Sequence, residues 1–124
     1  MLPTPWRYLR SSEGDREYLA LLTFLPLKRL WRAPWLLMQA LRVIRQLEHS
    51  PGLVAYSLST ELSKGHFWTL SVWEGEPALQ AFVHAAPHAN TMRSLAPHMG
   101  QTRFVRWVIR GSQLPVAWDE ALAR

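Results

Sequence analysis

The side chains best suited to chemistry lie in the second half of the chain. His84 and His88 are four residues apart, and Tyr56 places a phenol in an alternating, mostly apolar segment. An imidazole titrates near neutral pH, so a histidine can accept or donate a proton during a reaction. We therefore take these three residues as the catalytic candidates, with one of the histidines or Tyr56 as the proton carrier. Surface or helix-capping histidines are the alternative interpretation.

A metal site is a second use for the same histidines. On one unbroken helix, His84 and His88 would share a face and could bind a metal ion. Pro87 lies between them and interrupts the helix, and no carboxylate stands from residue 78 to residue 118. We therefore predict no metal site.

Aromatic side chains are the second group of residues that could form a site. Seven tryptophans occur in 124 residues. Trp68 and Trp73 are an odd number of positions apart in a strand-like segment, so they point to opposite faces. Core packing is the alternative role for each of them. Together, the aromatic residues predict an aromatic-lined pocket, whose candidate lining residues are Trp68, Trp73, Trp31, Trp35 and Phe67.

Arg106 is the sixth pocket candidate. It interrupts an apolar strand and could hold an anionic group. The alternative is an ion pair with a carboxylate such as Glu61 or with a residue of a partner.

Composition and charge exclude several classes of protein. The chain has the length of one domain, and the absence of cysteine excludes disulfides and cysteine chemistry. No phosphate-binding loop, Ser-His-Asp signature or carboxylate pair is present. The net charge of +5 is dispersed, and Lys28, Arg29 and Arg32 form its one tight group. We interpret the charge as serving solubility and predict no nucleic-acid or membrane partner. Salt-sensitive binding of anionic lipid or DNA by this group is the alternative.

The N-terminus offers no apolar region typical of a signal peptide. The uncharged stretch 18–27 is half the length of a membrane span. The sequence therefore predicts a cytoplasmic protein.

Hydrophobic periodicity predicts an irregular arm over 1–16, a domain over 17–110 and a tail over 111–124. Alternation predicts strands over 17–25, 53–60, 66–73 and 102–110. Period-3.6 patterns predict a helix over 34–49, a second from residue 76 onward that continues as a short piece over 88–95, and one in the tail over 116–123. The order β-α-β-β-α-β predicts an α+β, ferredoxin-like fold with a four-stranded antiparallel sheet and both helices on one face. Because the strand 17–25 is apolar on both faces, we expect a homodimer that packs sheet face on sheet face.

The stretch 67–82, FWTLSVWEGEPALQAF, carries a strand ending in Trp, an acidic turn and a helix ending in Phe. With the preceding Pro51-Gly52 and the following His84-Ala-Ala-Pro-His88, it resembles the dimeric α/β-barrel superfamily, in particular the antibiotic-biosynthesis-monooxygenase-like group. The resemblance covers about residues 17 to 110.

This resemblance implies a dimeric α/β barrel. The family includes small monooxygenases that act on polycyclic aromatics, some without a cofactor. It also includes haem-degrading monooxygenases, whose site combines an Asn on the first strand with a Trp on the third strand and a His. Here Trp68 or Trp73 and His84 or His88 match the latter two, whereas the first strand offers Thr23 in place of Asn. The cofactor is therefore left open between none and haem.

Together these features predict a monooxygenase-like oxidoreductase that acts on an apolar or aromatic ligand between helices and sheet. The alternative is a non-catalytic ligand-binding or dimerisation module on the same fold.

Overall fold

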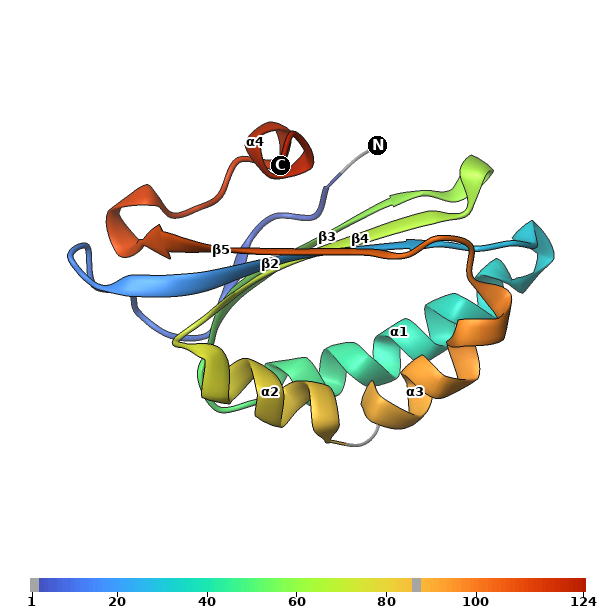
Figure 1. Ribbon diagram of the computed structural model, residues 1–124, viewed down its shortest axis with the longest axis horizontal. Coiled ribbons are helices and arrows are strands. Elements are labelled where there is room, and N and C mark those ends of the chain that lie inside the picture. Colours follow the sequence, from blue (N-terminus) through green and yellow to red (C-terminus); the bar gives the residue numbers. More distant parts are fainter. Residues whose placement is uncertain (1–2, 86–87) are drawn as a thin grey trace.

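Within residues 3–85 and 88–124, which the computed structural model describes, five strands form one antiparallel sheet (Figure 1). The strands are β1 (Arg7–Tyr8), β2 (Glu17–Pro26), β3 (Leu53–Glu61), β4 (His66–Trp73) and β5 (Arg103–Arg110), and their order in the sheet is β1-β3-β4-β2-β5. The four strands expected from alternation are all present.

The prediction of a four-stranded sheet is wrong by one short edge strand. In β1, Arg7 pairs with Tyr56 and Tyr8 with Ala55, so the N-terminal arm extends the sheet beyond β3. Two residues are too few to show an alternating pattern, and Pro3 and Pro5 just before them favour irregular backbone. Only the exposed edge of β3 makes this pairing available.

Four α-helices complete the described chain: α1 (Ala33–Glu48), α2 (Glu76–His84), α3 (His88–Leu95) and α4 (Trp118–Leu122). Proline stands within the first two positions of both α1 and α2, where its missing N–H costs no hydrogen bond. The expected helix break at Pro87 lies outside the described residues, but α2 ends at His84 and α3 begins at His88. Both helical regions cross over the same face of the sheet, which gives the ferredoxin-like arrangement predicted.

The helical layer packs against the sheet through two separate buried clusters. One joins Trp73 of β4 to Leu79 and Phe82 of α2 and to Leu47 near the end of α1. The second cluster lies around the opposite ends of the helices and contains Leu27, Leu36, Phe67, Leu95 and Met99. The two clusters fix the distance between sheet and helices at both ends of the layer.

The opposite face of the sheet is covered in part by the chain itself. A third cluster joins Tyr18, Leu22 and Val72 of the sheet to Val116 and Ala121 of the C-terminal tail. Figure 1 shows α4 and the first residues that the structure describes on this side and α1, α2 and α3 on the other. The indole Nε1 of Trp118 in α4 also donates a hydrogen bond to Ser57 Oγ at 3.0 Å. A second subunit is therefore not required to cover this part of the sheet.

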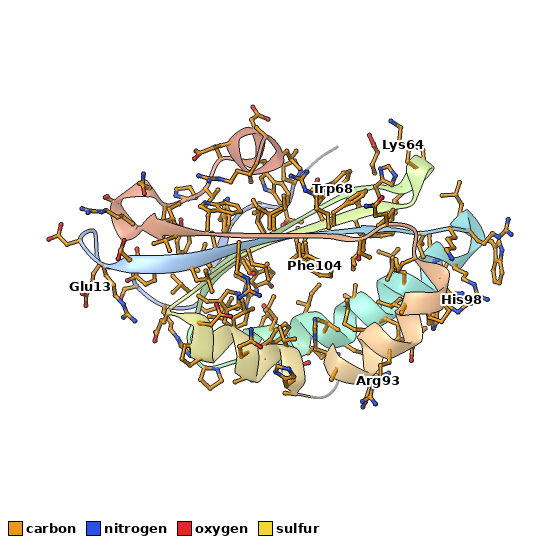
Figure 2. All side chains as sticks on the ribbon, in the orientation of Figure 1. Glu13, Lys64, Trp68, Arg93, His98 and Phe104 are labelled. Carbon is orange, nitrogen blue, oxygen red and sulfur yellow. The ribbon has the colours of Figure 1, made fainter. Side chains whose placement is uncertain are left out.

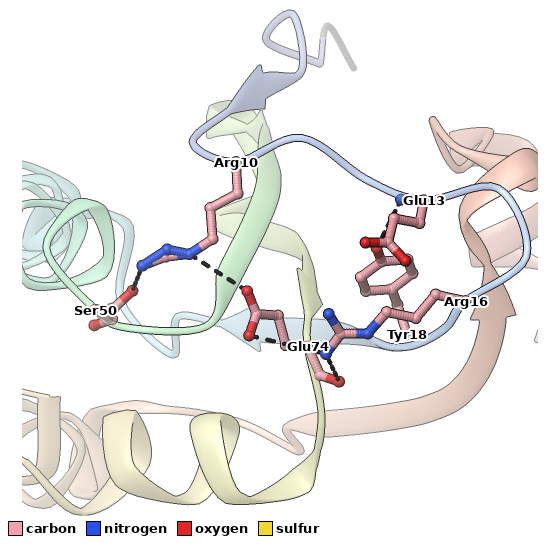
Figure 3. A network of polar contacts seen from close by, with 6 residues as sticks. All are labelled: Arg10, Glu13, Arg16, Tyr18, Ser50 and Glu74. Atoms are coloured by element: carbon pink, nitrogen blue, oxygen red, sulfur yellow. Dashed lines mark hydrogen bonds and ion pairs between the residues drawn. The ribbon is translucent and has the colours of Figure 1, made fainter.

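A polar network attaches the N-terminal arm to the turn between β4 and α2 (Figure 3). Arg10 and Arg16 approach Glu74 with N–O distances of 3.6 and 3.9 Å, and Arg10 also donates to the carbonyl of Ser50. The Tyr18 hydroxyl accepts the backbone N–H of Glu13 at 2.9 Å. Exposed ion pairs contribute little stability individually, so their main effect is to fix the path of the arm.

We expect Gly52, in the turn between α1 and β3, to be intolerant of a side chain. Its φ of +86° is costly for any residue with a Cβ atom, and an added Cβ would overlap Ala78 Cβ in α2. Gly52→Ala should therefore lower the free energy of unfolding by about 1–3 kcal/mol in chemical denaturation.

Gly75→Ala is the matched control, because a Cβ there meets its nearest atom, in Pro77, at 3.7 Å and the backbone is extended. Equal stability losses in the two variants would contradict the role assigned to Gly52.

Candidate functional site

A cavity of about 860 Å³ lies between the sheet and the helical layer. It occupies the space between the two packing clusters, and most of the surface that lines it is apolar. Its floor comes from strands β2, β3, β4 and β5 and its roof from helices α1, α2 and α3. A volume of this size can enclose a ligand of several fused rings.

Polar groups in the cavity are few and come from both walls. The cross-strand pair Thr23 and Thr69 and the neighbouring Ser71 lie on the floor, while Thr91 and His88 of α3 lie in the roof. Residues 88 and 91 are one helical turn apart and therefore share a face of α3. Such isolated hydroxyl groups in an apolar cavity can orient a ligand that carries a few oxygen atoms.

His88 is the titratable side chain that lies in the cavity roof. Its ring packs on Phe82 with a centroid distance of 4.7 Å, and its Nδ1 lies 3.1 Å from the carbonyl oxygen of Val83. A carbonyl can only accept a hydrogen bond, so Nδ1 carries the proton in the neutral ring and Nε2 retains a free lone pair. Burial lowers the pKa of His88, although the hydrogen bond to Val83 opposes this shift. The ring is therefore neutral at pH 7 and able to accept a proton.

Gln46 of α1 positions His88 and was not among the residues identified from the sequence. Its Oε1 accepts the backbone N–H of His88 at 2.7 Å, and its Nε2 donates to the carbonyl of Phe82 at 3.0 Å. Periodicity alone assigns Gln46 to the polar, outward face of its helix. The side chain instead lies between α1 and the junction of α2 and α3, which only the packing of the three helices reveals.

The other two catalytic candidates lie away from the cavity. His84 is exposed at the end of α2, where its Nδ1 lies 2.8 Å from the carbonyl of Gln80. Tyr56 donates its hydroxyl to Glu48 at 2.9 Å, and Glu48 also pairs with Arg7. Burial and the neighbouring carboxylate raise the pKa of Tyr56, so its phenol stays protonated. The structure therefore brings only His88 of the three candidates to the cavity.

The tryptophans divide between the faces as their odd spacing predicts. Trp73 is 1% exposed, lines the cavity beside Phe67 and donates its Nε1 to Ser71 at 2.9 Å. Trp68 also borders the cavity, but its indole packs on Phe24 on the opposite face, with ring centroids 5.1 Å apart. Figure 2 shows Trp68 and Phe104 on opposite sides of the sheet.

Two further pocket candidates lie outside the cavity. Trp31 is 71% exposed, and Trp35 packs edge to face on His98 at 5.4 Å. Neither indole lines the space between the sheet and the helices. The sequence shows that these residues are aromatic. It does not show that Trp31 faces solvent before α1, or that Trp35 within α1 packs beside the buried cluster that contains Leu36.

Arg106 of β5 lies at one mouth of the cavity, beside the exposed Phe104. Its guanidinium forms an ion pair with Glu76 at the start of α2, not with Glu61. Gln80, which also lines the cavity, donates to the Glu76 carboxylate at 2.8 Å. These two contacts, first that of Gln80 and then that of Arg106, lower the pKa of Glu76. The mouth therefore presents a paired charge rather than a free cation.

Haem does not fit these residues well. Its two propionates need cationic or hydrogen-bonding partners, and Arg106 is the one cationic side chain among the described lining residues and is already paired with Glu76. The floor position expected for a polar amide on the first strand carries Thr23. No group of three or more potential metal ligands occurs within the described part of the chain.

Solved structures with similar architecture carry monooxygenase descriptions. A candidate monooxygenase from Lactobacillus acidophilus NCFM has a TM-score of 0.64 at 10% identity; the match covers 82% of this chain and 50% of that one, so this chain spans about half of that relative's length. SnoaB, a cofactor-independent oxygenase from Streptomyces nogalater, has a TM-score of 0.64 at 13% identity over 79% of this chain and 97% of that one. A candidate antibiotic biosynthesis monooxygenase from Nitrosomonas europaea has a TM-score of 0.65 at 11% identity over 72% and 95%.

These likenesses confirm, at the level of fold, the resemblance to antibiotic-biosynthesis-monooxygenase-like proteins. The chain is a ferredoxin-like α+β protein with their architecture. No family model matches the sequence, and no curated protein does so either. Fold alone does not define an activity, so the site must carry the functional argument.

The partly buried ring of His88 predicts a pH-dependent stability. An unfolded chain takes up a proton on this histidine near its ordinary pKa of about 6.5, whereas the folded chain takes it up at a lower pH. Stability is therefore fully present above about pH 6.5 and falls as the pH drops through the folded-state pKa. His88→Asn should make the unfolding free energy less sensitive to acid in denaturant titrations from about pH 8 to pH 5.

His84→Asn serves as the control, since that imidazole is exposed. If His88→Asn retained the full acid dependence of the natural chain, His88 would not be the buried titrating group.

Proposed function

We propose that this protein is a small oxygenase-like enzyme that binds an apolar, polycyclic phenol in the cavity between sheet and helices. The observation that carries the proposal is a neutral imidazole, His88, in the roof of a mostly apolar cavity of about 860 Å³. The description of the S. nogalater neighbour as a cofactor-independent oxygenase supports the same class of reaction.

The chemistry requires a base and a dry cavity rather than a metal. Nε2 of His88 would remove a proton from the bound phenol or from an activated ring CH₂ group, which leaves an electron-rich carbanion for attack by O₂. Conversion of CH₂ to C=O places one oxygen atom of O₂ in the product and releases the other as water, so the reaction balances without an added reductant. Exclusion of water protects the anion from reprotonation by solvent.

The lowered pKa of His88 has two opposing effects on this role. It keeps the ring unprotonated and ready at neutral pH, but it also makes the ring a weaker base. A substrate with an acidic proton, such as a phenol conjugated to a carbonyl, matches this base better than a plain hydrocarbon. The hydroxyls of Thr23, Thr69 and Thr91 can hold the oxygen atoms of such a substrate.

Two cavity variants separate binding from turnover. His88→Gln should leave binding unchanged, measured by quenching of tryptophan fluorescence, and lower O₂ consumption by about 10²–10⁴-fold with a panel of tricyclic and tetracyclic phenols. Thr69→Phe fills the middle of the cavity and should weaken binding at least about tenfold. His84→Gln is the matched control and should change neither quantity.

A non-catalytic ligand-binding module is the alternative function. It predicts tight binding that Thr69→Phe abolishes, together with no O₂ consumption by the natural chain. If the phenols did not bind at all, the assignment of the cavity as a ligand site would itself be wrong.

A homodimer is the second part of the proposal, and we infer that it uses the sheet face near Trp68. The C-terminal tail packs on the Tyr18 and Val72 region of that face, whereas Phe24, His66 and Trp68 form a partly exposed aromatic group beyond it. Partly exposed aromatic side chains that are already in contact with one another favour an interface.

Sedimentation equilibrium should then give twice the chain mass of 14.3 kDa. Trp68→Glu should shift the protein to the monomer mass, because the interface would bury an unpaired charge. Phe104→Glu replaces an aromatic residue on the other side of the sheet and should leave the mass unchanged. A natural chain that sediments as a monomer at micromolar concentration would refute this interface.

A further inference from the structure

An exposed apolar surface covers the outer side of α1 and the turn before it. Trp31, Met38 and Leu41 are 71%, 62% and 63% exposed, and Leu30 and Leu37 are also exposed. Positions 34, 38, 41 and 45 repeat at helical spacing and thus lie along one side of α1. We call Leu30, Trp31, Leu37, Met38 and Leu41 the α1 apolar face.

The charged residues of the segment that carries this face all have one sign. Between Glu17 and Glu48 the chain carries five cations, Lys28, Arg29, Arg32, Arg42 and Arg45, and no acidic residue. Within the described residues, none of the five forms a salt bridge, although other cations of the chain do so. The guanidinium of Arg32 stacks over the rings of Trp31 and Trp35, at 4.4 and 5.7 Å. The segment alone accounts for a charge of +5, equal to the net charge of the whole chain.

The cavity also reaches this face. Leu37 and Leu41 line the cavity and are at the same time exposed to solvent, so the cavity opens along the edge of α1. This mouth is distinct from the one at β5, where the paired Arg106 and Glu76 stand. An apolar compound could thus pass between the α1 apolar face and the cavity without crossing a charged pair.

We propose that the α1 apolar face docks on the surface of an anionic phospholipid bilayer. A helix with exposed Leu, Met and Trp side chains, flanked by Lys and Arg and free of acidic residues, is the pattern of an interfacial membrane-binding helix. Tryptophan prefers the headgroup region, and each cation near an anionic surface adds attraction. The described chain contains no helix that is long and apolar enough to cross a bilayer, so the contact is peripheral.

Two other occupants of this face, a second copy of the chain and a nucleic acid, are less favourable than a bilayer. A second copy of the chain would bring two sets of five unpaired cations together, which is unfavourable. A nucleic acid would satisfy the cations, but it would leave Leu37, Met38 and Leu41 without an apolar partner. A bilayer surface supplies both negative charge and apolar volume. We therefore revise the sequence-based expectation of no membrane partner, which rested on the dispersal of the basic residues along the chain.

Docking would give the proposed enzyme direct access to an apolar ligand dissolved in lipid. This delivery step rests on the proposed function, whereas the docking itself does not. Vesicle binding in the absence of any cavity ligand therefore tests the docking alone.

The experiment is co-sedimentation of the full chain with phosphatidylcholine vesicles that contain about 30% phosphatidylserine, compared with phosphatidylcholine vesicles alone. The natural chain should bind the anionic vesicles, and binding should weaken as salt rises from about 0.05 M to 0.5 M. Arg42→Glu should weaken binding at least about fivefold. Trp31→Ser and Met38→Ser should each weaken it as well, in a way that low salt does not rescue.

The charge variant and the aromatic variant each have a matched control elsewhere on the surface. Arg93→Glu on α3 changes charge by the same amount as Arg42→Glu, and Tyr8→Ser removes an exposed aromatic ring on β1. Neither control should alter vesicle binding, and circular dichroism spectra should be unchanged in all variants.

Four results would overturn the proposal. One is failure of the natural chain to bind anionic vesicles. The second is an equal loss for Arg93→Glu and Arg42→Glu, which would indicate a non-specific charge effect. The third is a change of sedimenting mass in Met38→Ser, which would make the α1 apolar face an interface between copies of the chain. Tighter binding of duplex DNA than of the vesicles would likewise assign the face to nucleic acid.

Discussion

The separation between the sheet and its helical layer is the constraint on which the rest of the structure depends. Trp73 and Phe82, with ring centroids 5.2 Å apart, hold α2 at one end of the layer. The cluster that contains Phe67 and Leu95 holds α3 at the other end. Between these two supports the lining side chains, such as Ala40, Thr23 and Thr69, are too small to fill the gap. Interiors are otherwise closely packed, so an apolar space of this size is a built feature that large residues at both ends keep open.

The junction between α2 and α3 places a titratable side chain in this space. Because α2 ends at His84 and a new helix begins at His88, backbone groups at the junction need partners from another element. Gln46 of α1 supplies them on one side, and the carbonyl of Val83 binds the imidazole of His88 on the other. The same contacts that close the helical layer therefore set the position and the tautomer of the buried histidine. Burial then keeps the ring neutral, which is the state that a base requires.

The molecule distributes its apolar surface unevenly. The C-terminal tail covers much of the sheet face that the helices leave open, through Val116, Trp118 and Ala121. Apolar side chains that are not covered in this way include the partly exposed aromatic group near Trp68, the α1 apolar face, and Phe104 and Val108 of β5. These surfaces differ in charge, because all five cations of the 18–47 segment accompany the α1 apolar face. Two apolar surfaces with different charge are suited to different partners, which is why a subunit contact and a lipid contact are assigned to different sides of the molecule.

The sequence by itself determined the element order, the antiparallel ferredoxin-like fold and the division of Trp68 and Trp73 between faces. These follow from local periodicity, because alternation and helical spacing are properties of consecutive residues. The strand over 66–73 agrees residue for residue with β4, whereas the two-residue β1 was missed because pairing with β3, not periodicity, creates it. Only the tertiary structure decided that His88 and not His84 or Tyr56 lies at the cavity, that Trp31 and Trp35 lie outside it, and that Arg106 pairs with Glu76. Those outcomes depend on contacts between residues far apart in the chain, 42 positions for Gln46 and His88 and 63 for Trp35 and His98, and no local pattern encodes such contacts.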